Sequence, residues 1–505
     1  MSSRQPRVVV VGSGPTGATY ARRLLERTTG VSVLMVEAGP ALTDPLGMNV
    51  RNIADPAEQA AAKQASQGPA SGRAGVRGIP TGAVMDGTVT ARQGTHLVGR
   101  AAEGSRGMPA AAAATCVGGQ GAHWTCATPR PVGSERIPFL EDDLDGLLDE
   151  AERLLHTTHE AFSGAPQATT LLGLVRDEFA DDGLLVQPLP VAGDPQVDGS
   201  MRWSGTDVVL ADLASPGAHS DRFELRTETL AVRLLVEDGG VVGVVLRDLA
   251  SGTETEERAD EVVVAADALR TPQLLWASGI RPDALGRYLT EHPLIFGVVA
   301  VKDGLLPPLD PGDAPVDPVR VVVGVRFDED RHPFHAQMLY SPVCPIPLPP
   351  DSPYAGNAAG YVGMGWGVRK WPRPEDRLHF DDAERDENGL PGIRIAYEVT
   401  DREEAQLEQA RAFQARAAAA LGSFIDGMPV VMPPGSSLHY MGTVRMGPEN
   451  DGTSVCDSYS RVWDVPGLVL AGNGLIPTAN SCNPTLTSVA LAVRGADALA
   501  ERLSG

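Results

Sequence analysis

The chain is poor in cysteine. Its 505 residues include only five, an odd number, at positions 116, 126, 344, 456 and 482. No two of them form a Cys-x-x-Cys pair, so we expect neither a disulfide framework nor a zinc site, and no other metal site is expected. The first residues, Met-Ser-Ser-Arg-Gln-Pro-Arg, enter an apolar run without the parts of a secretory signal. These absences favour a reducing, cytoplasmic compartment.

Long apolar runs and positive charge are also scarce. No stretch approaches the roughly 18 apolar residues that a membrane-spanning helix needs, so we expect no membrane association. The 42 Lys and Arg residues face 65 Asp and Glu residues, which gives a formal net charge of −23. This acidic surplus argues against nucleic acids, anionic membrane surfaces and polyanionic substrates as partners.

The N-terminal segment carries a dinucleotide-binding pattern. An apolar run at residues 8–11 predicts a buried parallel strand, residues 15–28 a helix, and residues 31–37 a second strand. Gly12-Ser13-Gly14-Pro15-Thr16-Gly17 joins the first strand to the helix, and Glu37 ends the second strand. In this context the glycines allow a tight turn, a close approach of the backbone to a pyrophosphate, and close packing of helix on strand, while Glu37 would bind ribose hydroxyls.

The middle of the chain mixes further helices and strands. We expect helices at 141–155, 167–180 and 402–422, and strands at 223–235, 240–248 and 261–265. Alternation of apolar and polar residues with frequent prolines at 296–345 predicts an antiparallel sheet with one covered face. Residues 56–114, rich in Ala, Gly, Gln and Ser, are expected to form an extended, weakly structured insertion.

Two further regions carry motifs. Residues 115–129 contain paired glycines followed by His123-Trp124-Thr125-Cys126. The last seventy residues contain the run 439–447, of the form H-x-x-G-T-x-R-M-G, then Gly472-Asn473-Gly474 and Asn483-Pro484-Thr485 before an apolar helix pattern at 486–499. Both ends of the chain are therefore expected to meet at one cofactor.

With these motifs the chain resembles the glucose–methanol–choline (GMC) oxidoreductases, a flavoprotein family, and within it the pyranose oxidases and bacterial glycoside 3-oxidases. The resemblance implies an α/β fold, with a Rossmann-type FAD-binding domain and an inserted substrate domain built on a largely antiparallel sheet. We assign residues 1–135, 205–300 and 435–505 to the FAD-binding domain. Residues 136–204 and 301–434 are assigned to the substrate-binding domain.

The resemblance also implies the site residues. His439 and Asn483 would be catalytic and would bind substrate together with Gln337. Contacts to FAD are expected from Gly12, Gly14, Thr16, Gly17, Glu37, Thr115, Gly118, Gly119, His123, Thr125, Cys126, Val232, Asn473 and Thr485. In pyranose oxidases the residue that matches His123 is covalently attached to the flavin. Here Ala122 precedes it in place of threonine, so both covalent and non-covalent binding stay open.

The expected reaction is oxidation of a secondary hydroxyl of a pyranose or glycoside, at C2 or C3, to a ketone. Hydride would pass to flavin N5 while a neutral imidazole takes the hydroxyl proton and the amide orients the hydroxyl. Reoxidation would use O₂, giving hydrogen peroxide, or a quinone. The loop 339–347 departs from that of the fungal enzymes, which favours a glycoside over free glucose. The alternatives are oxidation of another alcohol by FAD and a non-redox lyase on the same scaffold. A monomer is favoured, because no oligomer-forming arm is recognisable.

Overall fold

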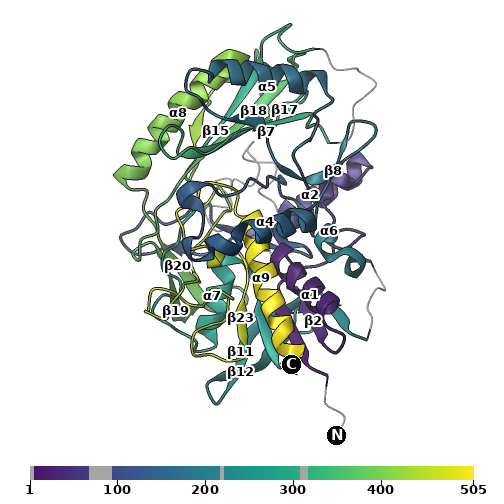
Figure 1. The fold of residues 1–505 in the computed structure, drawn as a ribbon, viewed down its shortest axis with the longest axis vertical. Coiled ribbons are helices and arrows are strands. Elements are labelled where there is room, and N and C mark those ends of the chain that lie inside the picture. The colour runs from purple at the N-terminus through teal and green to yellow at the C-terminus, as the bar shows by residue number, and fades with distance from the viewer. Residues whose placement is uncertain (1–4, 68–93, 216–220, 308–316, 505) are drawn as a thin grey trace.

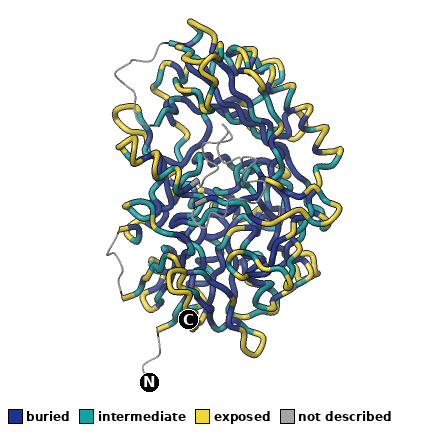
Figure 2. The backbone as a smooth tube through the Cα atoms, turned by 180° about the vertical axis from the view of Figure 1, so that it is seen from behind, coloured by how far each residue is buried: buried dark blue, intermediate teal, exposed yellow. Residues whose placement is uncertain are grey.

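The computed structural model describes residues 5–67, 94–215, 221–307 and 317–504. Within them, the elements form one half built on a parallel sheet and a second half built on a larger sheet (Figure 1). Buried backbone runs through the strands of both halves, and exposed residues lie on the outer loops (Figure 2). No helix in these ranges has the length and apolar character needed to cross a membrane.

The first half is organised around a parallel sheet. The strand order is β10 (Phe223–Arg226), β2 (Ser32–Val36), β1 (Arg7–Val11), β14 (Glu261–Val264) and β23 (Leu468–Leu470). The four residues 8–11 are all buried, as expected for a parallel strand that is covered on both faces. The fold thus brings the N-terminal strands and a C-terminal strand into one sheet, with β14 between β1 and β23.

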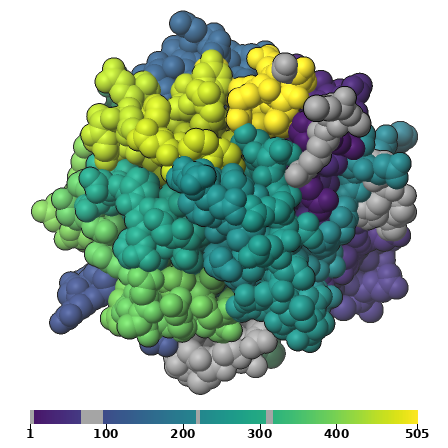
Figure 3. Space-filling view, turned by 90° about the horizontal axis from the view of Figure 1, so that it is seen from below, coloured from purple at the N-terminus to yellow at the C-terminus, as the bar shows by residue number. Residues whose placement is uncertain are grey.

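Helices from opposite ends of the chain cover one face of this sheet. Helix α1 (Pro15–Arg27) and helix α9 (Thr485–Ser504) share one apolar core with α4 (Glu141–Leu155). In Figure 3 the C-terminal residues in yellow lie next to N-terminal residues in purple. The other face of the sheet shares a core with the antiparallel sheet of β11 (Thr229–Glu237), β12 (Gly240–Asp248) and β13 (Glu254–Arg258).

The second half contains the larger sheet. Its strand order is β21 (Gly422–Phe424), β15 (Leu294–Val301), β18 (Tyr361–Val368), β17 (Phe334–Ser341), β16 (Val321–Val325) and β7 (Val186–Pro188), with β22 (Val430–Val431) also paired to β15. All its pairings are antiparallel. Helices α5 (Pro166–Glu178) and α8 (Asp401–Leu421) pack on one face (Figure 1). The predicted antiparallel sheet is confirmed, and the architecture is the predicted α/β fold with a second, largely antiparallel unit.

Smaller elements complete the fold. Helix α7 (Asp267–Ala277) follows β14, and α6 (Thr206–Leu210) lies beside α1. Two three-stranded sheets consist of β19 (Arg377–Arg385), β20 (Pro391–Ala396) and β4 (Arg100–Ala101), and of β6 (Thr157–Thr158), β8 (Val191–Pro195) and β9 (Met201–Trp203). Short 3₁₀ turns are η1 (Val50–Asn52), η2 (Gly119–Ala122), η3 (Gly133–Glu135), η4 (Pro138–Leu140), η5 (Ala211–Ala214) and η6 (Asn473–Leu475).

The prediction of weak structure at 56–114 is wrong for the part described. Residues Pro56–Gln67 form helix α2, and β3 (Gly94–Leu97) pairs with β5 (Ala112–Thr115). The Ala-rich composition gave no clear helix or strand pattern, but it is compatible with both kinds of element. Ala112 and Ala113, for example, are small residues of β5 that are buried by neighbouring segments. Residues 68–93 of this segment lie outside the described ranges.

Three other elements differ from the expectation. The predicted strand 223–235 is two strands in different sheets, because Glu228 adopts a positive φ of 50° between them and turns the chain. Strand β15 begins at Leu294, inside the range assigned to the FAD-binding domain, and pairs in the larger sheet. Helix α4, assigned to the substrate-binding domain, packs on α9 because its buried leucines share that core.

Candidate active site

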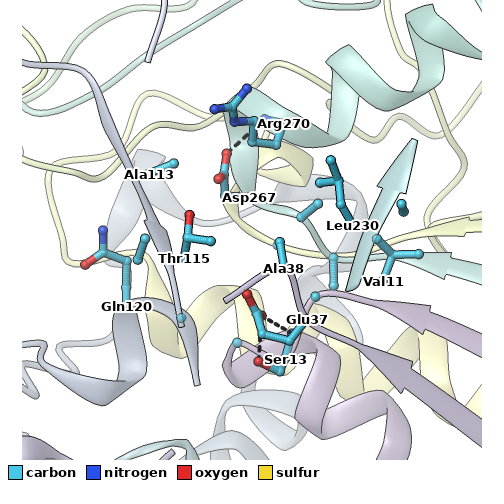
Figure 4. A pocket seen from close by; sticks show the side chains of 18 of the residues that line it. Val11, Ser13, Glu37, Ala38, Ala113, Thr115, Gln120, Leu230, Asp267 and Arg270 are labelled. Atoms are coloured by element: carbon cyan, nitrogen blue, oxygen red, sulfur yellow. Dashed lines mark hydrogen bonds between the residues drawn. The ribbon is translucent and has the colours of Figure 1, made fainter. Parts of the chain in front are cut away.

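A cavity of about 520 Å³ lies at the carboxyl ends of β1 and β2 (Figure 4). Its lining includes the predicted cofactor residues Gly12, Gly14, Thr16, Glu37, Thr115, Gly119, Asn473 and Thr485. These residues come from the beginning, the first quarter and the end of the chain. The parallel sheet brings them together because β1 lies between β2 and β14, and β23 follows β14.

In the first turn, two glycines permit close packing of the backbone and a third borders open space. Gly12 has φ +102°, and a Cβ there would lie 2.4 Å from the Ala265 carbonyl oxygen. A Cβ on Gly17 would lie 2.1 Å from the Gly12 carbonyl oxygen, so Gly17 permits the close helix packing that the sequence suggested. A Cβ on Gly14, the N-cap of α1, would meet no atom within 4 Å. Free space at a helix N-terminus suits a phosphate, because amide donors point into it.

Glu37 lies at the base of this cavity and faces Ser13 (Figure 4). Its carboxylate accepts hydrogen bonds from the Ser13 hydroxyl at 2.7 Å and from the Gly39 amide at 2.9 Å. Burial raises the pKa of Glu37, and these hydrogen bonds partly offset that effect. The carboxylate is thus oriented by the protein at the edge of the space where a ribose would lie.

The second glycine pair packs against the first turn. Gly118 donates its amide to the Ser13 hydroxyl at 3.0 Å, and a Cβ on Gly119 would lie 3.3 Å from Gly14 Cα. Gly118 itself does not line the cavity but supports the residues that do. Val232 is buried in one apolar cluster with Leu235 and Val245. The residues of β11 that line the cavity are Thr229, Leu230 and Ala231.

Sequence reasoning missed Asp267 and Arg270, which also line this cavity (Figure 4). Asp267 has φ +63° and caps the start of α7 by accepting from the Arg270 amide at 3.0 Å. The Arg270 guanidinium pairs with Asp386 at 2.7 Å. The strand–turn–helix pattern at 261–275 was the available signal for them, but it did not show that this turn faces the cofactor site.

A second cavity, of about 570 Å³, adjoins the first. Gln120, Trp124, Leu438, Asn473 and Thr485 line both. Of the remaining predicted site residues, the second cavity contains His123, Thr125, Gln337, His439 and Asn483. Gly17, Gly118, Cys126 and Val232 line neither cavity. Cys126, with φ +65°, instead points its thiol towards the Ser204 carbonyl oxygen at 3.4 Å, beneath the lining. A cofactor in the first cavity would therefore border directly on the second.

His439 contacts a histidine that sequence reasoning did not assign to the site. The two Nδ1 atoms of His439 and His292 are 3.1 Å apart, and their rings meet edge to face with centroids 4.9 Å apart. Burial lowers the pKa of His439 to about 4. Burial, together with His439, lowers the pKa of His292 well below its ordinary value. Both imidazoles are therefore neutral near pH 7, and His439 is available as a proton acceptor.

Gln337 and His123 also present atoms that the described protein leaves unsatisfied. Gln337 Oε1 is buried without a hydrogen-bond partner in the described chain, although the side chain lines the second cavity. His123 Nδ1 is likewise buried without a partner in the described chain, whereas its Nε2 lies 3.2 Å from the Thr95 hydroxyl. Burial lowers the pKa of His123 to about 4. A buried polar atom of this kind is expected to find a partner in a bound ligand.

Glu135 holds the segment that precedes Asn483, and the sequence gave no signal for it. Its carboxylate accepts from the Ser481 amide and hydroxyl, both at 2.8 Å, and from the Cys482 amide at 3.2 Å. Its other oxygen lies 3.0 Å from His335 Nε2. Burial opposes its ionisation, but His335 and the Ser481 donors together hold the pKa of Glu135 below its ordinary value.

Glu135, His335 and Cys482 also form the one group of three possible metal ligands found in the described ranges, with ligand atoms within 4.8 Å of one another. The hydrogen bonds above already occupy the carboxylate, and burial raises the pKa of the Cys482 thiol well above its ordinary value. A thiol that resists deprotonation is a poor ligand, so this group is better described as an anchor for the loop.

Comparison with known proteins places this site in a family. Residues 197–294 and 372–492 match the N- and C-terminal family models described as "GMC oxidoreductase". A C-glycoside 3-oxidase from Microbacterium trichothecenolyticum is 46% identical over 99% of this chain and 97% of its own length. One from Arthrobacter globiformis is 45% identical, with the same coverage. A pyranose 2-oxidase from Tricholoma matsutake is 29% identical over 98% of this chain and 94% of its own.

A solved structure supports the same fold. Pyridoxine 4-oxidase from Mesorbium loti superposes with a TM-score of 0.65 over 98% of this chain and 99% of its own, at 18% identity. At that identity the likeness concerns the fold alone. The full-length sequence relatives and the two matched models show that the chain belongs to the GMC oxidoreductase family, whose members bind FAD.

Proposed function

We propose that this protein is an FAD-dependent oxidase of a secondary hydroxyl in a pyranose glycoside, acting at C3. One observation carries the proposal: the cavity lined by Gly12, Gly14 and Glu37 borders a second cavity that contains His439 and Asn483. The names of the two most similar relatives reported above, both C-glycoside 3-oxidases, favour C3 over C2. The same likeness disfavours the two alternatives, oxidation of an unrelated alcohol and a non-redox lyase.

The residues of the first cavity fit FAD. The space above Gly14 and the N-terminus of α1 would hold the pyrophosphate, and Glu37 would accept from the ribose hydroxyls. Thr115, Gly119, Thr125, Asn473 and Thr485 would line the rest of the cofactor, towards the second cavity. When bound, FAD supplies the redox chemistry by accepting a hydride from the substrate carbon.

The chain's own residues supply the proton chemistry and the orientation. Neutral His439 takes the proton of the hydroxyl, and Asn483 holds that hydroxyl without competing for the proton. Gln337 offers its unpaired Oε1 to another sugar hydroxyl. Glu135 positions Asn483 by fixing the two residues that precede it.

The experiment that tests this function is anaerobic reduction of the flavin by a panel of sugars and glycosides, followed by NMR of the product. Bleaching with formation of a 3-keto product is expected, whereas a lyase would convert substrate without bleaching. His439→Ala should bind FAD but reduce it at least about a hundredfold more slowly. Reduction at the parent rate would reject His439 as the base.

Two finer points of the cofactor's chemistry belong to the same proposal. His123 is the residue through which a covalent bond to FAD would form, and acid precipitation distinguishes the two modes. Flavin left in the supernatant indicates non-covalent binding, and flavin in the pellet indicates the bond. Oxygen and a quinone are the proposed acceptors, and turnover assays with each one, with and without O₂, separate oxidase from dehydrogenase activity.

We further propose a monomer in the cytoplasm. All five cysteines are free, and four of them are buried, which fits a reducing compartment. Light scattering of the purified protein tests the monomer, since the chain mass is 53.0 kDa.

A further inference from the structure

The chain around His439 is paired with a second segment of backbone. Residues 439–441 run antiparallel to residues 290–292, and two backbone hydrogen bonds, of 3.0 and 2.9 Å, join one end of the pair. The register places Glu291 opposite Tyr440. Because the side chains of extended chain alternate between two faces, the two histidines of the pair line the second cavity, and Glu291 and Tyr440 lie on the opposite face of the pair.

Glu291 holds the turn that leads into His439 through both of its carboxylate oxygens. The Gly435 amide donates to Oε1 at 2.7 Å, and the Ser437 hydroxyl donates to Oε2 at 2.9 Å. The oxygen of the same hydroxyl accepts from the His439 amide at 3.2 Å. A carboxylate that is only 1% exposed is thus connected to the backbone of His439 through a single hydroxyl group.

Gly435, the first residue of this turn, is fixed by its neighbours. Its carbonyl oxygen accepts from the Tyr440 hydroxyl at 2.7 Å, and the oxygen of that hydroxyl accepts from the Ala112 amide at 2.9 Å. Its φ of +96° suits glycine, and a Cβ there would lie 2.4 Å from the Ala111 amide nitrogen. Glu291 therefore acts on a turn that is anchored at its first residue.

The residue directly before His439 has a strained conformation. Leu438 has φ +59°, in the left-handed region that leucine rarely adopts and that persists only where the surrounding structure imposes it. The hydrogen bond from the His439 amide to the Ser437 hydroxyl closes the chain around Leu438, and Glu291 orients that hydroxyl. The conformation of Leu438, which lines both cavities, sets the direction in which the chain enters His439.

Both protonation states of Glu291 are compatible with this turn. Burial raises the pKa of Glu291 to about 7, and the donors of Gly435 and Ser437 oppose that rise. A protonated carboxyl still accepts from the Gly435 amide with one oxygen and donates to the Ser437 oxygen with the other. That oxygen keeps a second lone pair for the His439 amide. A glutamine side chain offers the same combination of one acceptor and one donor.

We propose that Glu291 is a positioning residue, which keeps the turn 435–438 in the conformation that places the His439 imidazole against the substrate hydroxyl. This inference rests on the proposed function, because it assumes that His439 is the base. Glu291 lines neither cavity and acts only through the residues of the turn.

The test is anaerobic stopped-flow reduction of the flavin in the holoenzyme by phenyl β-D-glucoside. In Glu291→Leu the turn loses its acceptor, and the rate at saturating glucoside should fall at least about tenfold, because small misplacements of a catalytic group are costly. Glu291→Gln should stay close to the parent rate. The matched control is Glu261→Leu, since Glu261 is a buried carboxylate at the first residue of β14, at the end of the strand away from the cavity. It should lower the melting temperature and keep the parent rate.

A second measurement tests the strained turn itself. Glycine adopts the left-handed conformation without a steric penalty, so in Leu438→Gly the shape of the turn depends less on Glu291. The factor by which Glu291→Leu slows reduction should therefore be at least about threefold smaller in the Leu438→Gly background than in the parent. A role of Glu291 in overall stability alone would give the same factor in both backgrounds.

The outcomes separate this inference from the proposed function. A parent-like rate in Glu291→Leu, an equal loss in Glu261→Leu, or equal factors in the two Leu438 backgrounds would overturn the inference and leave sugar oxidation intact. Should Glu291→Leu fail to fold, Ser437→Ala replaces it with the same expectations, because it removes only the hydroxyl that joins Glu291 to the His439 amide. Reduction of His439→Ala at the parent rate, or no bleaching of the parent by any glycoside, would instead reject the proposed function.

Discussion

The side chains of His292 and His439 contact each other through the same ring atom, with 3.1 Å between their Nδ1 nitrogens. Since both rings are neutral, one nitrogen must donate a proton and the other accept it. If His439 is the donor, its Nε2 carries a lone pair and can act as a base. His292 then has its proton on Nε2, an atom that is buried without a partner in the described chain. We infer that His292 is a positioning residue that selects the basic tautomer of His439.

Replacement of His292 tests this role. In His292→Leu the acceptor for the His439 Nδ1 proton is lost, so the rate of flavin reduction at saturating substrate should fall by about tenfold or more. In His292→Gln the amide oxygen can accept that proton, and most of the rate should return. Stopped-flow reduction measures both, together with the apparent substrate Kd, which should change little. A purely structural role would give equal losses in both variants.

The pH dependence of flavin reduction follows from the buried imidazole. Because burial lowers the pKa of His439 to about 4, the neutral base persists from pH 9 down to pH values well below 6.5. Titration of His439 should therefore leave the rate of flavin reduction constant over this range. The rate should fall only as the pH decreases through about 4. A decrease centred near 6.5, the ordinary pKa of histidine, would contradict the buried environment.

The same shift predicts how stability changes with pH. Between pH 6.5 and about 4 the unfolded chain protonates His439 whereas the folded chain does not. The unfolded state then binds more protons than the folded state. Titration of His439 therefore lowers the free energy of unfolding as the pH falls through this window. Denaturant unfolding at pH 7 and pH 5, compared between the parent and His439→Gln, should show a smaller pH effect in the variant.

The parts of the site that sequence reasoning predicted are those encoded by local motifs. Gly12, Gly14 and Gly17 lie within six residues of one another, and their spacing is meaningful only between a strand and a helix, as found here. Likewise, the apolar strand β23 and the helix α9 were both visible from periodicity. The residues of such patterns are close in the sequence, so the patterns can be recognised before the structure is known.

The parts that were missed depend on contacts between distant residues. Glu135 and Ser481 are 346 residues apart in the chain, and His292 and His439 are 147 apart. No spacing rule connects them, because the sheet topology sets which loops meet.

Glu135 should be needed for both stability and catalysis. In Glu135→Ala the buried amide of Ser481 and the side chain of His335 lose their partner, which should lower the free energy of unfolding by about 3–5 kcal/mol. Glu135→Gln keeps an oxygen for the Ser481 donors and should lose less. Urea unfolding measures both variants, and flavin reduction should slow in parallel as Asn483 becomes less well held. Equal stability of Glu135→Ala and the parent would contradict the anchoring role.

Two neighbouring glycines should separate folding from cofactor binding. Gly12→Ala strains a backbone at φ +102° and drives Cβ into the Ala265 carbonyl, so it should destabilise the apoprotein by on the order of 1–3 kcal/mol.

In Gly14→Ala the added methyl group meets no protein atom within 4 Å, so the apoprotein should keep its melting temperature. Its methyl group would enter the space assigned to the pyrophosphate and raise the Kd for FAD at least tenfold, about 1.4 kcal/mol. Gly30→Ala, with equally open space but outside the cavity, is the matched control and should bind FAD like the parent. Parent-like FAD affinity in Gly14→Ala would mean that the phosphates lie elsewhere.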